Sequence, residues 1–204
     1  MKEKNVHYIG LSTHRRIAPE AIGKVEAAAR SLLHKLKEEA IRENQELVML
    51  NSLAEGGDTM LAKLALSLNI PYIAILPREK ASYAEDFEGE ALCDFLTLCD
   101  QANAIAVTPN IEGDDRLDYD YFYRQAGIFV AARSDTFLAL WDGVPGKPDG
   151  CGAAEAYAFA QSAAYADPTG GSPLKSRTLY HILTPRPTQD TARAGEITVT
   201  KITV

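Results

Sequence analysis

Residues 6–42, VHYIGLSTHRRIAPEAIGKVEAAARSLLHKLKEEAIR, carry the pattern that decides the fold. An apolar run of strand length at 6–11 leads through a polar turn into a helix predicted over 19–42. Apolar residues recur in this helix at three- and four-residue steps, which predicts one buried face formed by Ile22, Val25, Ala29, Leu32 and Leu36. A strand, a turn and an amphipathic helix form the first half of a βαβ unit.

The same alternation continues along the chain and predicts an α/β fold, a Rossmann-like and mainly parallel sheet with helices on both faces. Further strands are predicted at 47–50, 71–76, 104–107, 136–141 and 179–183, with helices at 59–68, 83–101, 119–133 and 153–164. Polar or Gly- and Pro-rich segments at 110–118 and 166–176 are predicted to be loops. We expect a single domain over residues 1–204, with a core over about 5–183. The remaining 184–204 form a linker and a β-type tail that suits the sheet edge or a partner chain.

Composition and charge narrow the class of protein. The 204 residues are 46% hydrophobic and 24% charged, as expected of one globular domain. No apolar run approaches the roughly 20 residues of a membrane span, and no signal peptide begins the chain, so we expect a cytoplasmic protein without a membrane partner. The formal net charge of −7 argues against nucleic acid as a partner.

The cysteines predict neither a disulfide framework nor a zinc site. Cys93, Cys99 and Cys151 are odd in number and lack CxxC spacing. We predict that Cys93 and Cys99 are buried helix residues. No metal and no cofactor are expected.

The residues that follow the predicted strands are unusual for simple turns. They are 10–16 (GLSTHRR), 51–58 (NSLAEGGD), 76–78 (LPR) and 141–143 (WDG), together with 150–155 (GCGAAE) before the last helix. In parallel α/β sheets the ligand crevice lies outside the carboxyl ends of the strands, and helix N-termini there attract anions. Arg15, Arg16 and Arg78 could add charge-assisted contacts to phosphate. The sequence therefore predicts a pocket for an anionic, nucleotide-like small molecule.

Each candidate also has a structural explanation. Glycines serve turns whatever the ligand, Asp58 could cap a helix, and Glu155 suits the positive end of its helix. For His14 the structural and the ligand-binding interpretations have about equal weight. The acidic run at 85–90 is predicted to be a solvated helix start. The candidate ligand-binding residues are Gly10, Ser12, Thr13, His14, Arg15, Ser52, Glu55, Gly56, Gly57, Asp58, Arg78, Asp142, Gly143, Gly150, Gly152 and Glu155.

In combination, these motifs resemble the SLOG superfamily. The matching segments are 10–15, 50–58, 75–77 (ILP), 83–87 (YAEDF), 139–143 (ALWDG) and 152–155 (GAAE), and the resemblance spans about residues 5–183. The superfamily groups the DNA-processing protein DprA (Smf), the LOG phosphoribohydrolases and YpsA-like proteins. Within it, the chain is similar to a bacterial branch that opens with a Gly-x-x-Gly-His-Arg type turn, although Thr13 stands at the second Gly. The resemblance implies a sheet that binds nucleotide-derived ligands at this edge.

We therefore expect a nucleotide-binding sensor domain, whose partner is a nucleotide-derived small molecule. In this function Ser52, Gly56 and Gly57 would make close contacts and Arg15 and Arg78 would hold phosphate. The acceptors for ribose hydroxyls or a base would be Asp58, Asp142 and Glu155. A homodimer is left open.

Two other functions follow from the resemblance. A phosphoribohydrolase would cleave the N-glycosidic bond of a nucleoside monophosphate, with Glu155 as the catalytic residue. However, 148–155 is one residue shorter than the LOG motif Pro-Gly-Gly-x-Gly-Thr-x-x-Glu and has Ala153 in the Thr place. Binding is therefore placed ahead of catalysis, and whether the protein is an enzyme is left open. DprA-like binding of single-stranded DNA comes last, because the chain is acidic.

Overall fold

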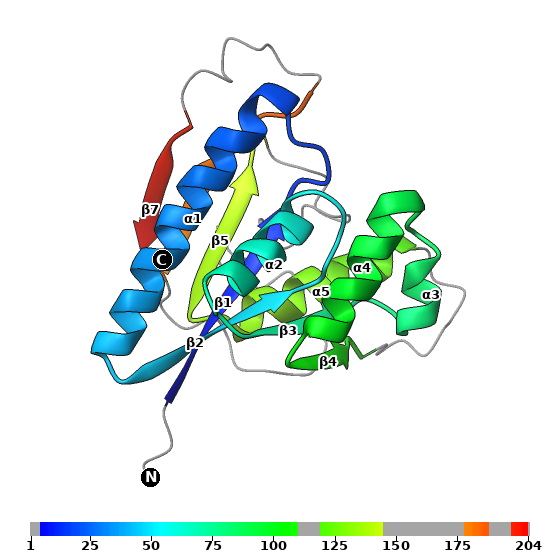
Figure 1. Ribbon diagram of the computed structural model, residues 1–204, viewed down its shortest axis with the longest axis horizontal. Helices are drawn as coiled ribbons and strands as arrows, with labels where there is room; N and C mark the ends of the chain where they lie inside the picture. Colours follow the sequence, from blue (N-terminus) through cyan, green and yellow to red (C-terminus); the bar gives the residue numbers. More distant parts are fainter. Residues whose placement is uncertain (1–4, 110–118, 145–177, 188–196, 204) are drawn as a thin grey trace.

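A seven-stranded sheet in the order β4-β3-β2-β1-β5-β6-β7 forms the centre of the protein (Figure 1). The structure, a computed structural model, describes residues 5–109, 119–144, 178–187 and 197–203. Neighbouring strands are parallel except β7, which is antiparallel to β6. The predicted α/β fold with a mainly parallel, Rossmann-like sheet is confirmed. The strands are β1 (Asn5–Thr13), β2 (Gln45–Asn51), β3 (Tyr72–Leu76), β4 (Ala104–Val107), β5 (Thr136–Trp141), β6 (Thr178–Leu183) and β7 (Val199–Thr203).

Helices cover both faces of this sheet, as Figure 1 shows. The helices are α1 (Pro19–Arg42), α2 (Gly57–Ser67), α3 (Lys80–Ala84), α4 (Gly89–Gln101) and α5 (Tyr119–Arg133). Successive β1 side chains point to opposite faces. Ile9 and Leu11 pack with α1 and α2, whereas Gly10 faces α5. This arrangement leaves the main hydrophobic core on the α1 side and smaller clusters on the α5 side.

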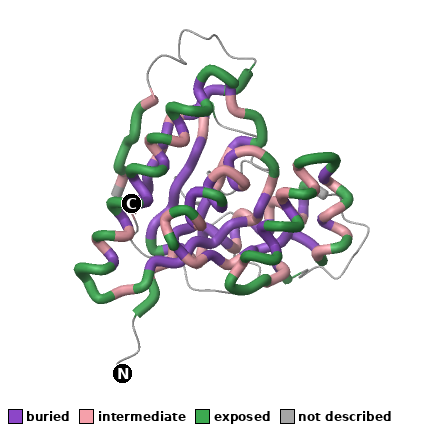
Figure 2. The backbone as a smooth tube through the Cα atoms, viewed as in Figure 1, coloured by how far each residue is buried: buried purple, intermediate pink, exposed green. Residues whose placement is uncertain are grey.

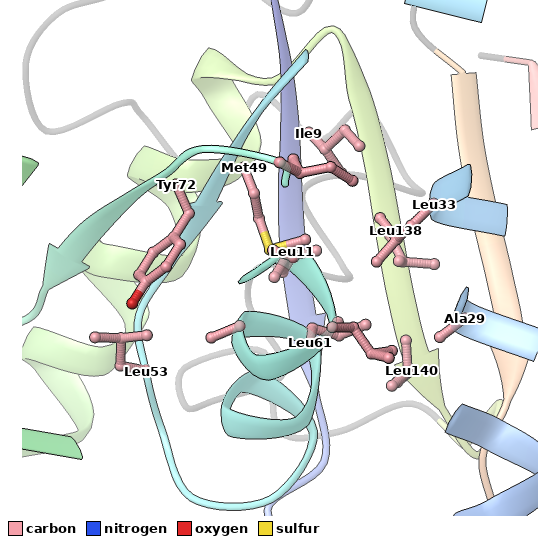
Figure 3. Close-up of a cluster of buried hydrophobic side chains, with 14 of the residues drawn as sticks. Ile9, Leu11, Ala29, Leu33, Met49, Leu53, Leu61, Tyr72, Leu138 and Leu140 are labelled. Carbon is pink, nitrogen blue, oxygen red and sulfur yellow. The ribbon is translucent and has the colours of Figure 1, made fainter. Parts of the chain in front are cut away.

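The main core lies between the central strands and α1 and α2. Figure 3 shows its side chains converging from β1, β2, β3 and β5, and Figure 2 shows the buried residues concentrated in these elements. The buried face of α1 consists of Ala21, Val25, Ala29, Leu32, Leu33, Leu36 and Ala40. The prediction for Ile22 was wrong, because one residue beyond Ala21 turns the side chain by about 100° and leaves it 44% exposed.

Several predicted boundaries also differ from the structure: those of β2, α2, β3 and β6 by one or two residues, and those of β1 and of the helix over 83–101 as follows. β1 continues beyond Leu11, because Ser12 and Thr13 pair with β5. The helix predicted over 83–101 is divided into α3 and α4, because Glu88 is extended and Gly89 has a φ of +54°. The break allows Phe87 to stack on Phe95 with ring centroids 4.6 Å apart.

The cysteines differ from each other in burial. Cys99 is buried on α4, as predicted, but Cys93 is exposed, which corrects its predicted burial. The inner face of α4 is instead formed by Phe95, Leu98 and Cys99.

The chain connectivity defines one special place at the sheet edge. From β1 the chain adds β2, β3 and β4 on one side, and α5 then returns it to β5 on the other side of β1. The carboxyl ends of β1 and β5 therefore meet at the topological switch point, where open α/β sheets bind ligands.

The C-terminal tail forms the sheet edge, one of the two alternatives for it. β7 pairs with β6 of its own chain over residues 199–203. Within the described ranges, none of the helices combines the length and hydropathy needed to cross a membrane.

Candidate functional site

His14 and Asp142 form a buried polar pair at the switch point. His14 follows β1 and Asp142 follows β5, and the residues are 8% and 5% exposed. The Asp142 N–H donates to His14 Nε2 at 3.0 Å. Arg186, which follows β6, has its Nε 3.3 Å from the same His14 nitrogen and 3.1 Å from Asp142 Oδ2. Three neighbouring strand ends thus supply one cluster, the His14–Asp142–Arg186 cluster.

The hydrogen bonds indicate the charge of each member of this cluster. His14 Nε2 faces two N–H donors, which favour the neutral ring, and also lies 3.3 Å from Asp142 Oδ1, which favours the protonated ring. Burial, followed by the charge of Arg186, outweighs Asp142 and lowers the pKa of His14. Burial raises the pKa of Asp142, but the Val144 N–H bond and the neighbouring His14 and Arg186 outweigh it and lower the pKa. The cluster at neutral pH is therefore a neutral imidazole, a carboxylate and a half-exposed guanidinium.

Backbone hydrogen bonds fix the three strand ends relative to one another. His14 N–H donates to Leu140 O at 3.1 Å, and Thr184 N–H donates to Trp141 O at 2.8 Å. Ala18 N–H, just before α1, donates to Pro185 O at 2.9 Å. The cluster is thus carried by a rigid part of the sheet edge and by short connections, which suits a preorganised site.

The glycines before α2 hold two turns together. A Cβ on Gly57 would lie 2.5 Å from Thr13 Cβ, and one on Gly56, whose φ is +91°, would lie 2.1 Å from Arg15 O. The Gly57 N–H donates to His14 O at 3.1 Å. This close packing explains why glycine is needed at both positions. A ligand contact at either glycine stays a prediction.

Asp58 links the same two turns through its side chain. Its Oδ1 accepts from Thr13 Oγ1 at 2.7 Å, and its Oδ2 accepts from Ala54 N–H at 3.3 Å. Burial raises the pKa of Asp58 to about 6, although the bonds from Thr13 and Ala54 and the charge of Arg15 act in the opposite direction. Asp58 is thus a buried carboxyl that titrates close to neutral pH.

A second cluster of polar side chains follows β3 and contacts the turn after β1 through Tyr123. The Arg78 guanidinium donates to Asp86 Oδ2 at 2.5 Å and to Ser82 Oγ at 3.1 Å. The Tyr123 hydroxyl, on α5, donates to the same Asp86 oxygen. The Arg15 guanidinium lies over the Tyr123 ring, 5.2 Å from its centroid. Asp86 therefore has a buried structural role, which corrects its prediction as part of a solvated helix start.

The predicted site residues fall into distinct places. The structure brings together a group around the first turn, namely Thr13, His14, Arg15, Gly56, Gly57, Asp58 and Asp142. Ser12 lies within β1, and Gly10 lies deeper in that strand, against Ser134. Ser52 is half-buried, and Gly143 is exposed with a φ of +79°. Gly150, Gly152 and Glu155 lie outside the described residues.

Glu55 lines a groove that is separate from the His14–Asp142–Arg186 cluster. This groove of about 420 Å³ lies between α1, α2 and α4 and is also lined by Gly56 and several charged side chains. Arg78 is 7% exposed and its charge is compensated by Asp86, so a direct phosphate contact by Arg78 stays a prediction.

Sequence reasoning missed Arg186 and Tyr123. Arg186 stands three residues after the predicted strand at 179–183, so the rule applied to the other strand ends could have found it. The prolines on either side of Arg186 indicate only that the alternating pattern ends there. Tyr123 gave no such signal, because its partners Asp86 and Arg15 are distant in sequence and meet it only in the fold.

No protein-family model and no curated protein matches the chain. Among the described residues, no three or more His, Cys, Asp or Glu side chains are grouped so that they could hold a metal ion.

Proposed function

We propose that this protein binds a nucleotide or nucleotide-derived ligand at the carboxyl ends of β1 and β5. The observation that carries the proposal is the His14–Asp142–Arg186 cluster at the switch point of the sheet. Buried polar groups are costly unless paired, and the hydrophobic core does not need these three residues. A polar cluster at this position is therefore best explained by a ligand.

The charges around the cluster favour an anionic small molecule. Arg15 and Arg16 are exposed in the turn after β1, and Arg186 is half-exposed beside it. The whole chain carries −7, so this local positive charge suits phosphate on a small ligand better than a polyanionic strand. Arg186 contacts the His14 ring and the Asp142 carboxylate, which could meet the hydroxyls of a ribose.

Isothermal titration with AMP, ADP-ribose and adenosine tests this proposal. We expect AMP or ADP-ribose to bind the wild-type protein more tightly than adenosine, because only the first two carry phosphate. Arg186→Ala should weaken binding of the phosphorylated ligands by about tenfold or more, the size of a lost charge-assisted hydrogen bond.

Arg42→Ala is the matched control, because Arg42 is highly exposed at the last turn of α1 and remote from the strand ends. It should bind like the wild type. The proposal fails if neither phosphorylated ligand binds, or if a single-stranded oligonucleotide binds tightly while the nucleotides do not.

A further inference from the structure

The side chain of Arg15 is exposed, yet its guanidinium rests on an aromatic face. The Arg15 Cζ atom lies 5.2 Å from the centroid of the Tyr123 ring. An arginine side chain has many rotamers, and stacking on a ring selects a few of them. Arg15 comes from the turn after β1 and Tyr123 from α5, so the contact joins elements that are far apart in sequence.

The Tyr123 ring is in turn held in place through its hydroxyl group. Its hydroxyl donates to Asp86 Oδ2, and the same oxygen accepts from Arg78. The Arg78 and Asp86 side chains are only 7% and 11% exposed, which makes this ion pair a rigid support. The Tyr83 ring, fully buried, lies 6.2 Å from the Tyr123 ring and 5.9 Å from the Arg78 guanidinium.

We propose that Tyr123 is a positioning residue, which holds the Arg15 guanidinium where it meets the anionic group of the ligand. The buried Arg78–Asp86 pair acts through Tyr123. This inference rests on the proposed function, because it takes Arg15 as one of the arginines that meet the phosphate of the ligand.

A double-mutant cycle between Tyr123 and Arg15 tests the inference, with AMP and ADP-ribose as the probes and adenosine as the uncharged reference. Tyr123→Leu removes the ring, and we expect it to weaken AMP or ADP-ribose binding about fivefold. It should leave adenosine binding unchanged, because adenosine has no charge for Arg15 to meet. In the Arg15→Ala background, Tyr123→Leu should have no further effect.

Two further variants separate positioning from folding. Tyr123→Phe keeps the ring and removes the hydroxyl, which reaches Asp86 and also hydrogen-bonds with Arg15, so it should bind more tightly than Tyr123→Leu and less tightly than the wild type. Phe122→Leu removes a neighbouring aromatic ring from the same helix and should leave binding at the wild-type level. The inference is overturned if Tyr123→Leu weakens binding equally with and without Arg15, or weakens adenosine binding to the same extent.

A ligand-free measurement distinguishes failure of this inference from failure of the proposed function. In proton–nitrogen correlation spectra of the free protein, the Arg15 side-chain signal should carry a ring-current shift that Tyr123→Leu removes. If that shift is present and no nucleotide binds, the proposed function fails and the positioning role falls with it. If nucleotides bind and the cycle shows no coupling, only the positioning role fails.

Discussion

Among the carboxyl groups of the described residues, Asp58 departs furthest from the behaviour of an exposed carboxylate. Burial raises its pKa to about 6 from an ordinary value of 3.8. The unfolded chain therefore loses the proton at a lower pH than the folded protein does. The stability that Asp58 contributes is fully present below about pH 4 and is lost as the pH rises through about 6. A shift of about two pKa units corresponds to about 3 kcal/mol.

Asp58→Asn should remove this pH dependence, because the amide does not titrate. We expect the unfolding free energy of the variant, relative to wild type, to rise by about 2–3 kcal/mol between pH 4 and pH 7.5. Urea unfolding at both pH values measures it, and the comparison cancels the other carboxyls. A difference that stays constant with pH would show that Asp58 is ionised in the folded protein as readily as in the unfolded chain.

The sequence predicts individual site residues only where a local pattern, such as the end of a predicted strand, points to them. His14, Asp58 and Asp142 all follow strands of a predicted parallel sheet, so their placement at one edge could be anticipated. The partnership of Asp86 with Arg78 and Tyr123 could not, because it depends on how the break before α4 turns the chain. Periodicity finds faces of helices, but it does not find an ion pair between two turns, or the hydrogen bond that a tyrosine of another helix donates to it.

At the scale of elements, the turn after β1 and the loop before α2 behave as one unit. Gly57 lies against Thr13, and its N–H donates to His14 O. Thr59 N–H donates to Ala54 O, so at least two of the first N–H groups of α2 are used within the protein. Anion binding by this helix end, which the sequence suggested, is limited accordingly. The glycines instead let two site-bearing turns approach each other closely.

Gly57→Ala tests the role of this close packing. The added Cβ would lie 2.5 Å from Thr13 Cβ, so one of the turns must shift, and we expect a loss of about 1–3 kcal/mol in unfolding free energy. Gly23→Ala is the matched control, because Gly23 is exposed on α1 with nothing within 4 Å of the added atom. It should stabilise the protein by about 0.5–1 kcal/mol. Equal midpoints of urea unfolding for the two variants would contradict the packing argument.

At the scale of the whole molecule, hydrophobic periodicity was sufficient for the fold. The bounds predicted for α1, β4, α5 and β5 agree with the structure, because each has a clear apolar pattern between polar turns. The pairing partner of the C-terminal strand could not be predicted from the sequence. Alternation alone does not distinguish a strand added to its own sheet from one added to a partner chain. The switch point likewise follows from strand order, which no single segment encodes.

Chemical-shift mapping with AMP or ADP-ribose tests the central claim most directly, because it locates the ligand as well as detecting it. The account predicts that backbone amide signals change in the turn after β1, in the loop at 52–58, and around Asp142 and Arg186. Signals of the groove residues on α1 and α4, such as Arg30, Glu90 and Asp94, should stay in place. Changes confined to that groove, or no changes with either ligand, would contradict the claim that the carboxyl ends of β1 and β5 form a nucleotide site.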